Sequence, residues 1–137
     1  MTTFVVTVIG RVASSLGDLE RAPRQPDEGG PDAWLEFDEG VGDALADVRA
    51  GADLLVLTWL DRARRDVLRV HPRGDPQRAL EGVFTTRSPD RPNPIGLHLV
   101  HVIAVDGLRV RVRSLDAVDG TPIIDVKPVL PTDIRLR

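Results

Sequence analysis

A stretch rich in proline and arginine is the strongest candidate for chemistry in this 137-residue sequence. It runs from Thr85 to Gly96 (TTRSPDRPNPIG) and places three prolines within six residues. Proline fixes φ and removes a backbone donor, so the stretch predicts a rigid loop rather than a strand interior or a helix. The polar side chains on this loop are Arg87, Ser88, Arg91 and Asn93. A stiff frame suits a ligand clamp because little order remains to be imposed on binding, but a proline-stiffened turn with solvated arginines fits the composition equally well.

Two shorter segments combine charged groups with residues that favour turns. One runs from Asp116 to Pro122 (DAVDGTP) and carries two acids before an apolar run, and the other is Pro23-Arg24-Gln25-Pro26. Asp-Gly is a common turn, so a plain solvent-exposed turn is the favoured interpretation of the first segment on composition alone. The second segment has the same ambiguity.

Other arrangements of reactive side chains are not supported. His98 and His101 lie three apart in a predicted strand, where side chains alternate, so their rings should point to opposite faces of the sheet. A zinc site would need further ligands, none of which cluster nearby, and the sequence has no cysteine, so no metal is expected. His71 has no obvious serine or acid partner for a hydrolytic triad. No glycine-rich phosphate loop follows a strand, so ATP-driven and nicotinamide chemistry are not expected.

The composition argues against a strongly basic nucleic-acid-binding protein. The formal net charge is −3, and the chain has three Phe, two Trp and no Tyr on which bases could stack. Lys127 is the only lysine among 18 basic residues, a bias that a GC-rich genome explains more readily than a special function. The N-terminus lacks the features of a signal peptide, and no apolar run approaches the roughly 20 residues of a membrane span, so a cytoplasmic protein is expected.

Short apolar segments rich in β-branched residues dominate the rest of the chain. The predicted strands are Phe4–Ile9, Trp34–Phe37, Leu54–Leu60, Val67–Val70, Leu97–Val105, Leu108–Val112 and Ile123–Val129. One helix is predicted from Val41 to Val48, where apolar residues recur at helical spacing, and Gly51 would end it. Asp106-Gly107 indicates a hairpin turn. The economical architecture is a single domain over residues 1–137, mainly β, folded as a small antiparallel β-barrel with one or two short helices.

The charged segments match the signatures of a known family. The strongest matches are Gly82–Gly96 (GVFTTRSPDRPNPIG) and Leu115–Pro128 (LDAVDGTPIIDVKP), with shorter ones at Pro23–Pro26 and Ile9-Gly10. On these residues the sequence resembles the TsaA-like (YaeB, TrmO) proteins over almost its whole length. The resemblance implies a small β-barrel, a homodimer with the donor near the interface, and methyl transfer from S-adenosyl-L-methionine. Bacterial members of that family include the methyltransferase that acts on N6-threonylcarbamoyladenosine beside the tRNA anticodon.

The resemblance also implies which residues bind the donor, and it assigns no catalytic residue. The candidate donor-binding residues are Pro23, Arg24, Gln25, Asp61, Arg62, Arg87, Ser88, Arg91, Asn93, Leu97, Asp119, Gly120, Thr121 and Pro122. Asp119 is a candidate partner for the donor's ammonium or ribose hydroxyls, and Arg87 for its carboxylate. Arg91 and Asn93 match the motif but could equally hold the shape of the loop.

Two departures from the family pattern leave the methyl acceptor open. The family usually has Phe-Ser-His at the start of the central apolar strand and His at its end, whereas this chain has Gly51-Ala52-Asp53 and Asp61. The sequence also ends at Arg137, without the further C-terminal domain that many bacterial members carry. A tRNA methyltransferase, a methyltransferase with a small-molecule acceptor and a non-catalytic S-adenosylmethionine-binding module are therefore the alternatives. A basic rim formed by Arg62, Arg64, Arg65 and Arg73 would favour RNA.

Overall fold

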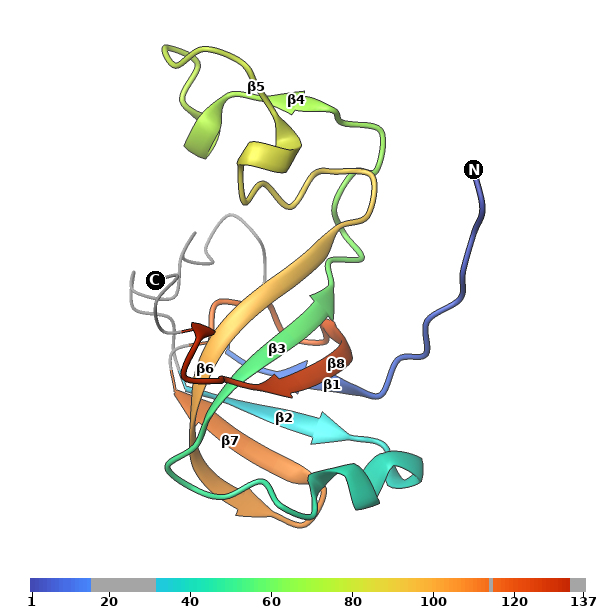
Figure 1. Ribbon diagram of the computed structural model, residues 1–137, viewed down its shortest axis with the longest axis vertical. Helices are drawn as coiled ribbons and strands as arrows, with labels where there is room; N and C mark the ends of the chain where they lie inside the picture. Colours follow the sequence, from blue (N-terminus) through green and yellow to red (C-terminus); the bar gives the residue numbers. More distant parts are fainter. Residues whose placement is uncertain (16–31, 114, 134–137) are drawn as a thin grey trace.

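Eight strands organise the part of the chain that the computed structural model describes, residues 1–15, 32–113 and 115–133 (Figure 1). Their bounds are β1 Gly10–Ala13, β2 Ala33–Phe37, β3 Asp53–Trp59, β4 Arg69–Val70, β5 Glu81–Gly82, β6 Ile95–Asp106, β7 Arg109–Arg113 and β8 Pro122–Pro128. The short 3-10 helices between them are η2 Glu39–Leu45, η3 Pro72–Gly74 and η4 Val83–Thr85. The prediction of a mainly β, antiparallel fold with few helical residues is confirmed.

Six of these strands form one antiparallel sheet that closes on itself. The order is β1-β2-β7-β6-β3-β8, and β8 pairs back to β1 to close the barrel. β6 is long enough to pair with β3 through its first half and with β7 through its second half. The register shifts between Val102 and Ala104, where a bulge bends the strand as it passes from one neighbour to the other. β4 and β5 form a separate small sheet beyond one end of the barrel (Figure 1).

The interior of the barrel is filled by alternate residues of its strands. In β7, Val110 and Val112 are 1% and 0% exposed, while the three arginines of the same strand face outward. The same two-residue period buries Leu54, Val56 and Thr58 in β3. The buried apolar core consists of Val12, Ala33, Leu35, Phe37, Leu54, Val56, Val100, Val102, Val110, Val112, Leu115, Ala117 and Ile123.

The predicted strand Phe4–Ile9 is wrong, and so are the bounds of the predicted strand Val67–Val70. β1 begins at Gly10. Of the residues before it, Ile9 donates its N–H to the Ile123 carbonyl of β8, and residues 4–8 have no strand partner in the described chain. A β-branched run predicts backbone shape, but a strand also needs a neighbour to which its N–H and C=O groups can bond. β4 is confined to Arg69–Val70 for the same reason, because only these residues face β5.

The predicted helix from Val41 to Val48 is also wrong in type. The segment is the 3-10 helix η2, followed by turns that end at Gly51, which has a φ of 94°. Gly40 and Gly42 lie within it, and glycine weakens an α-helix by about 1 kcal/mol relative to alanine. Val41 and the later apolar residues of the segment still pack against the core, as their spacing predicted. No helix of the described residues is long and apolar enough to cross a membrane.

Candidate functional site

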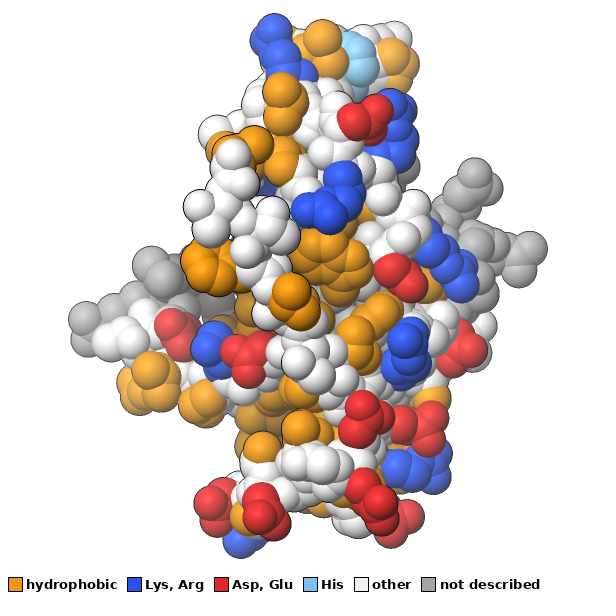
Figure 2. All heavy atoms as spheres, turned by 90° about the vertical axis from the view of Figure 1, so that its right-hand side faces the viewer, with side chains coloured by type: hydrophobic (Ala, Val, Ile, Leu, Met, Phe, Trp, Pro, Cys, Tyr) orange, Lys and Arg blue, Asp and Glu red, His pale blue; other side chains and the backbone are white. Residues whose placement is uncertain are grey.

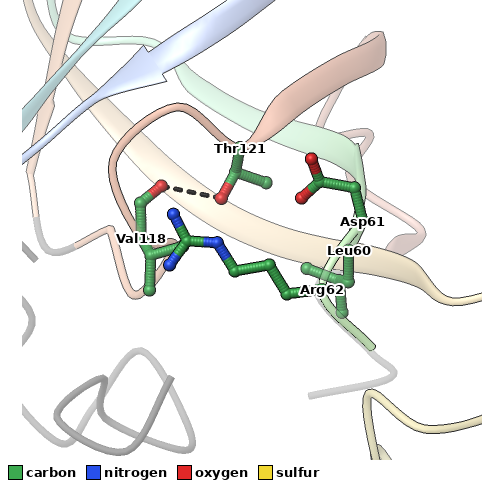
Figure 3. A pocket seen from close by; sticks show the side chains of 5 residues that line it. All are labelled: Leu60, Asp61, Arg62, Val118 and Thr121. Carbon is green, nitrogen blue, oxygen red and sulfur yellow. Dashed lines mark hydrogen bonds between the residues drawn. The ribbon is translucent and has the colours of Figure 1, made fainter. Parts of the chain in front are cut away.

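The end of β3 and the start of β8 meet around a small hollow (Figure 3). The two strands are antiparallel neighbours with Thr58 opposite Ile123, so the residues after β3 lie beside the turn that leads into β8. The hollow has a volume of ≈ 10 Å³ and is lined by Leu60, Asp61, Arg62, Val118 and Thr121. In Figure 3 the Asp61 carboxylate points toward Thr121, and the Arg62 side chain extends toward Val118. The structure therefore brings two predicted donor-site residues, Asp61 and Arg62, beside a third, Thr121, that is distant in sequence.

The turn before β8 is held to β1 by backbone groups. Thr121 Oγ1 donates to the Val118 carbonyl (2.7 Å), and the Gly120 N–H donates to the Val12 carbonyl (2.7 Å). Gly120 has a φ of 82°, a conformation that side-chain-bearing residues rarely adopt. Asp119 is exposed, and its Oδ1 accepts the N–H of Ser14 (2.9 Å), so the turn presents this carboxylate in a fixed position. Pro122 is buried as the first residue of β8.

The proline-arginine loop is held in shape by Arg91. Its guanidinium donates to the carbonyls of Ser88 (2.9 Å) and Thr86 (2.6 Å), and also to the carbonyl of Val83. The loop therefore wraps around the Arg91 side chain, which bonds to three backbone carbonyls of one short segment. Arg87 itself is exposed on that frame. Of the two interpretations of Arg91 from sequence, the geometry therefore favours the role of holding the loop.

Asn93 and Arg65 fasten the other half of the loop. Arg65 donates from Nε to the Pro92 carbonyl (2.8 Å) and from Nη2 to Asn93 Oδ1 (3.0 Å), and it lies over the ring of Trp59. The Leu60 N–H donates to the Pro94 carbonyl (2.8 Å), which places the end of the loop beside the residues that line the hollow. The loop base and the hollow are thus neighbouring parts of one surface.

A pair of opposite charges lies in the same region. Arg64 donates to Asp66 at 3.1 and 3.0 Å, and its backbone N–H donates to Asp90 Oδ1 (2.9 Å). The hydrogen bond and the charge of Arg64 hold the pKa of the Asp66 carboxyl below its ordinary value, and Asp66 in turn raises the pKa of Arg64. The positive charge of Arg64 is therefore offset by a neighbouring carboxylate.

A buried polar network that the sequence analysis missed links this surface to the barrel interior. His98 Nδ1 lies 2.6 Å from Asp116 Oδ1, and its Nε2 lies 2.8 Å from Thr58 Oγ1. Because a carboxylate only accepts, Nδ1 carries a proton and donates to Asp116. The His98 and Asp116 side chains are 8% and 13% exposed, so each depends on the other for a partner. The network anchors the start of the Asp116–Pro122 segment to β6.

The sequence predicted that the two histidines of β6 point to opposite faces, but it did not predict the partners of His98. His98 and His101 do bond to different partners, His98 to Asp116 inside and His101 to Asp53 (3.0 Å) near the surface. Apolar alternation alone did not place His98 in the interior, because Ile95 and Leu97 lie on the exposed face of β6 and His98 shares the buried face with Val100. A buried imidazole requires hydrogen-bonding partners, which is the signal that could have pointed to the acid before the turn.

Of the remaining predicted residues, Leu97 lies on the barrel and Ser88 lies within the proline-arginine loop. Leu97 is 44% exposed on the outer face of β6. Ser88 is half-buried, and its hydroxyl accepts the N–H of Asp90 (3.2 Å) within the loop. Pro23–Gln25 lies outside the described residues, so its place in the site stays a prediction, as does donor binding by every residue of the set.

Residues 11–133 match the family model of the tRNA-methyltransferase O N-terminal domain. The chain therefore belongs to this family, which confirms the family expected from the sequence motifs. A solved structure, that of TrmO from Pseudomonas aeruginosa, superposes with a TM-score of 0.77 at 27% identity and covers 96% of this chain. This chain spans 58% of the Pseudomonas protein's length.

Curated relatives carry names that refer to the donor. A protein of Archaeoglobus fulgidus named "S-adenosyl-L-methionine-binding protein" is 41% identical over 127 residues, 93% of this chain and 90% of the relative. A second protein from the same organism, named "Probable S-adenosyl-L-methionine-binding protein", is 41% identical over 90% of this chain but only 33% of its own length. A Methanothermobacter thermautotrophicus relative of that second name is 42% identical over 88% of this chain and 85% of its own length.

Proposed function

We propose that this chain binds S-adenosyl-L-methionine and transfers its methyl group to a nitrogen of an adenosine modified as N6-threonylcarbamoyladenosine in tRNA. Family membership, together with relatives named for binding this donor, is the observation that carries the proposal. An acceptor nitrogen attacks the methyl carbon of the donor's sulfonium in line, without a covalent enzyme intermediate. The carbon–sulfur bond breaks, S-adenosyl-L-homocysteine leaves, and the nitrogen gives up its proton. The protein's part is to align the reactants and exclude water.

The polar groups at the site fit such a donor. The exposed Asp119 carboxylate, fixed by the Ser14 N–H, would accept from the donor's ammonium or ribose hydroxyls. Arg87 is exposed on a loop whose shape Arg91 holds, so its guanidinium would face the donor's carboxylate at small ordering cost. Asp61 and Arg62 offer a second pair of charges beside the turn.

The site also supports a homodimer as the working form. A hollow of ≈ 10 Å³ is far smaller than the roughly 300–1,000 Å³ of ordinary ligand pockets, so one chain alone encloses little of the donor. The outer face of β3 and β6 is apolar, with Leu57 opposite Leu97 and Trp59 opposite Ile95. Ile95 and Leu97 are 43% and 44% exposed, which is unfavourable unless another surface covers them. We propose that a second copy covers this face and completes the pocket at Leu97.

One observation favours a small-molecule acceptor as the alternative. The rim expected to contact RNA is partly neutralised, because Arg64 pairs with Asp66 and Arg65 is engaged by the loop. Figure 2 shows acidic side chains gathered at the end of the molecule away from the β4–β5 sheet, in keeping with the net charge of −3. A phosphate backbone binds best to a continuous basic surface.

Donor binding is tested by calorimetric titration with S-adenosyl-L-methionine. We expect Arg87→Ala and Asp119→Ala each to weaken binding at least tenfold, about 1.4 kcal/mol, because each removes one charged contact to the donor. Arg113→Ala and Asp43→Ala are matched controls, since both side chains are exposed away from the hollow. Unchanged affinity in both site variants would refute the site.

The acceptor is tested with purified tRNA. S-adenosyl-L-homocysteine should accumulate with tRNA that carries N6-threonylcarbamoyladenosine and not with unmodified tRNA, and mass spectrometry should find the added methyl on that nucleoside. Donor binding with no turnover on either tRNA would leave the donor site standing and reject tRNA as the acceptor.

A further inference from the structure

The first eight residues form an extended apolar arm outside the barrel. Figure 1 shows this segment, in dark blue, leaving the barrel next to β1 and running away from it. Phe4, Val5 and Val6 are 87%, 93% and 59% exposed, and no side chain of the arm, Met1–Val8, is charged. Large apolar side chains exposed together mark a contact surface. Within the described chain, nothing covers them.

Strand β8 has a free edge that matches the arm in length. β1 pairs with β8 at Pro122 and Ile123, and beyond these residues the described chain pairs β8 with β3 alone. The Val126 N–H is bonded to the carboxylate of its own neighbour, Asp125 (2.9 Å), instead of to a strand. Counted residue by residue from Gly10 opposite Ile123, residues 4–9 would lie opposite residues 124–129, with the pairing offset by one residue if the irregularity of β8 at Ile124 is kept. An extended segment can bind such an edge by adding a strand to it.

A groove with a partly apolar lining lies along the same edge. It has a volume of ≈ 680 Å³, and its apolar lining includes Ile124, Val126 and Val129 of β8 and its continuation and Val41, Leu45 and Val48 of the η2 segment. Asp47, Asp53, Asp125 and Lys127 add charged groups to it. Side chains alternate across a strand, so a strand added to β8 would direct every second residue into the groove. The phenylalanine and valines of the arm are of the chemical type that this lining accepts.

We infer that the arm of one copy adds to the free edge of β8 in a second copy, and that the exchange is reciprocal. The arm precedes Ile9, whose N–H donates to the Ile123 carbonyl (2.9 Å), and it diverges from its own β8 on the N-terminal side of this bond, so it is presented outward. In a closed dimer, reciprocal exchange of one element covers the apolar side chains of both arms and pairs the free β8 edge of both copies. β8 also neighbours β3, so the exchanged arms continue the proposed outer interface of β3 and β6. The inference rests on the proposed homodimer but not on methyl transfer.

Engineered cysteines test the exchange, because the natural chain has none. If the exchanged arm takes on the partner's β8 the register counted from Gly10 opposite Ile123, residue 6 lies opposite residue 127, so Val6→Cys mixed with Lys127→Cys should form a disulfide-linked heterodimer under mild oxidation. The rate should exceed that of Val6→Cys mixed with Arg113→Cys at least tenfold, since β7 lies away from the groove. Equal rates would overturn the inference. A double Val6→Cys, Lys127→Cys variant that closes only within one chain would overturn it too, by showing that the arm folds onto its own barrel.

Removal of the arm separates this inference from the proposed dimer. Analytical ultracentrifugation of a chain lacking residues 1–8 should give a dimer dissociation constant raised at least tenfold, while circular dichroism shows the barrel intact. If the shortened chain dimerises as well as the full chain, the arm exchange is wrong and the homodimer stands. If the full chain is monomeric at all concentrations, both are wrong.

Discussion

Gly96 stands where β6 passes directly over the buried polar network. It lies opposite Thr58 in the pairing of β3 with β6. A Cβ added at Gly96 would be 2.3 Å from Thr58 Oγ1, 2.7 Å from His98 Nε2 and 3.2 Å from Leu60 Cδ2. The first two separations are well inside van der Waals contact, and both atoms are held by the hydrogen bond between them. Gly96→Ala must therefore displace the strand or break the Thr58–His98 bond.

Either outcome has a predictable cost. Overpacking a filled interior costs about 1–3 kcal/mol, and a buried donor or acceptor left without a partner costs about 1–3 kcal/mol. We expect Gly96→Ala to lower the free energy of unfolding by about 3 kcal/mol, since the crowded atoms are the hydrogen-bonded ones. With a urea m-value of about 1–3 kcal/mol/M for a chain of this size, the denaturation midpoint should fall by about 1–3 M.

Urea denaturation followed by circular dichroism measures this change. Gly82→Ala is the matched control, because a Cβ there meets nothing within 4 Å and the residue also lies in a strand. We expect the control to change the unfolding free energy by less than about 0.5 kcal/mol. If the unfolding free energy of Gly96→Ala also differs from that of the parent by less than about 0.5 kcal/mol, the network tolerates the methyl group and the reasoning is refuted.

Two further predictions concern the supports of the site. His98→Leu should lower the unfolding free energy by about 3 kcal/mol, because it leaves the buried Asp116 carboxylate without its donor. Adding Asp116→Leu should restore part of this loss in urea denaturation, and a purely additive loss would contradict the pairing. Arg91→Lys should raise amide hydrogen exchange at Thr86 and Ser88, because an ammonium cannot reproduce the planar fork that reaches three carbonyls. Unchanged exchange would show that the prolines alone order the loop, and Arg113→Lys is the control.

Strands could be predicted from the sequence where the residues of one segment are enough to show an extended backbone and a buried face. The alternation of Leu108–Val112 fixes which residues face inward, because a strand with one buried face must repeat every second residue, whereas the continuous apolar run Leu54–Leu60 predicts a strand without telling its two faces apart. The arm at Phe4–Val8 has the same composition and is unpaired. Composition reports the preference of a backbone for an extended shape, whereas pairing depends on which other segment comes to lie alongside it.

Part of the candidate site could likewise be predicted from the sequence and part could not. The sequence by itself determined the stiff proline-arginine loop, the acidic turn at Asp119–Gly120 and the family to which they belong, because proline and glycine act through local backbone geometry. Only the tertiary structure decided that Asp61 and Arg62 meet that turn and that His98 bonds to Asp116. These contacts join segments far apart in the chain, and they follow from the pairing of β3 with β6 and β8, a property of the closed sheet that no single segment carries.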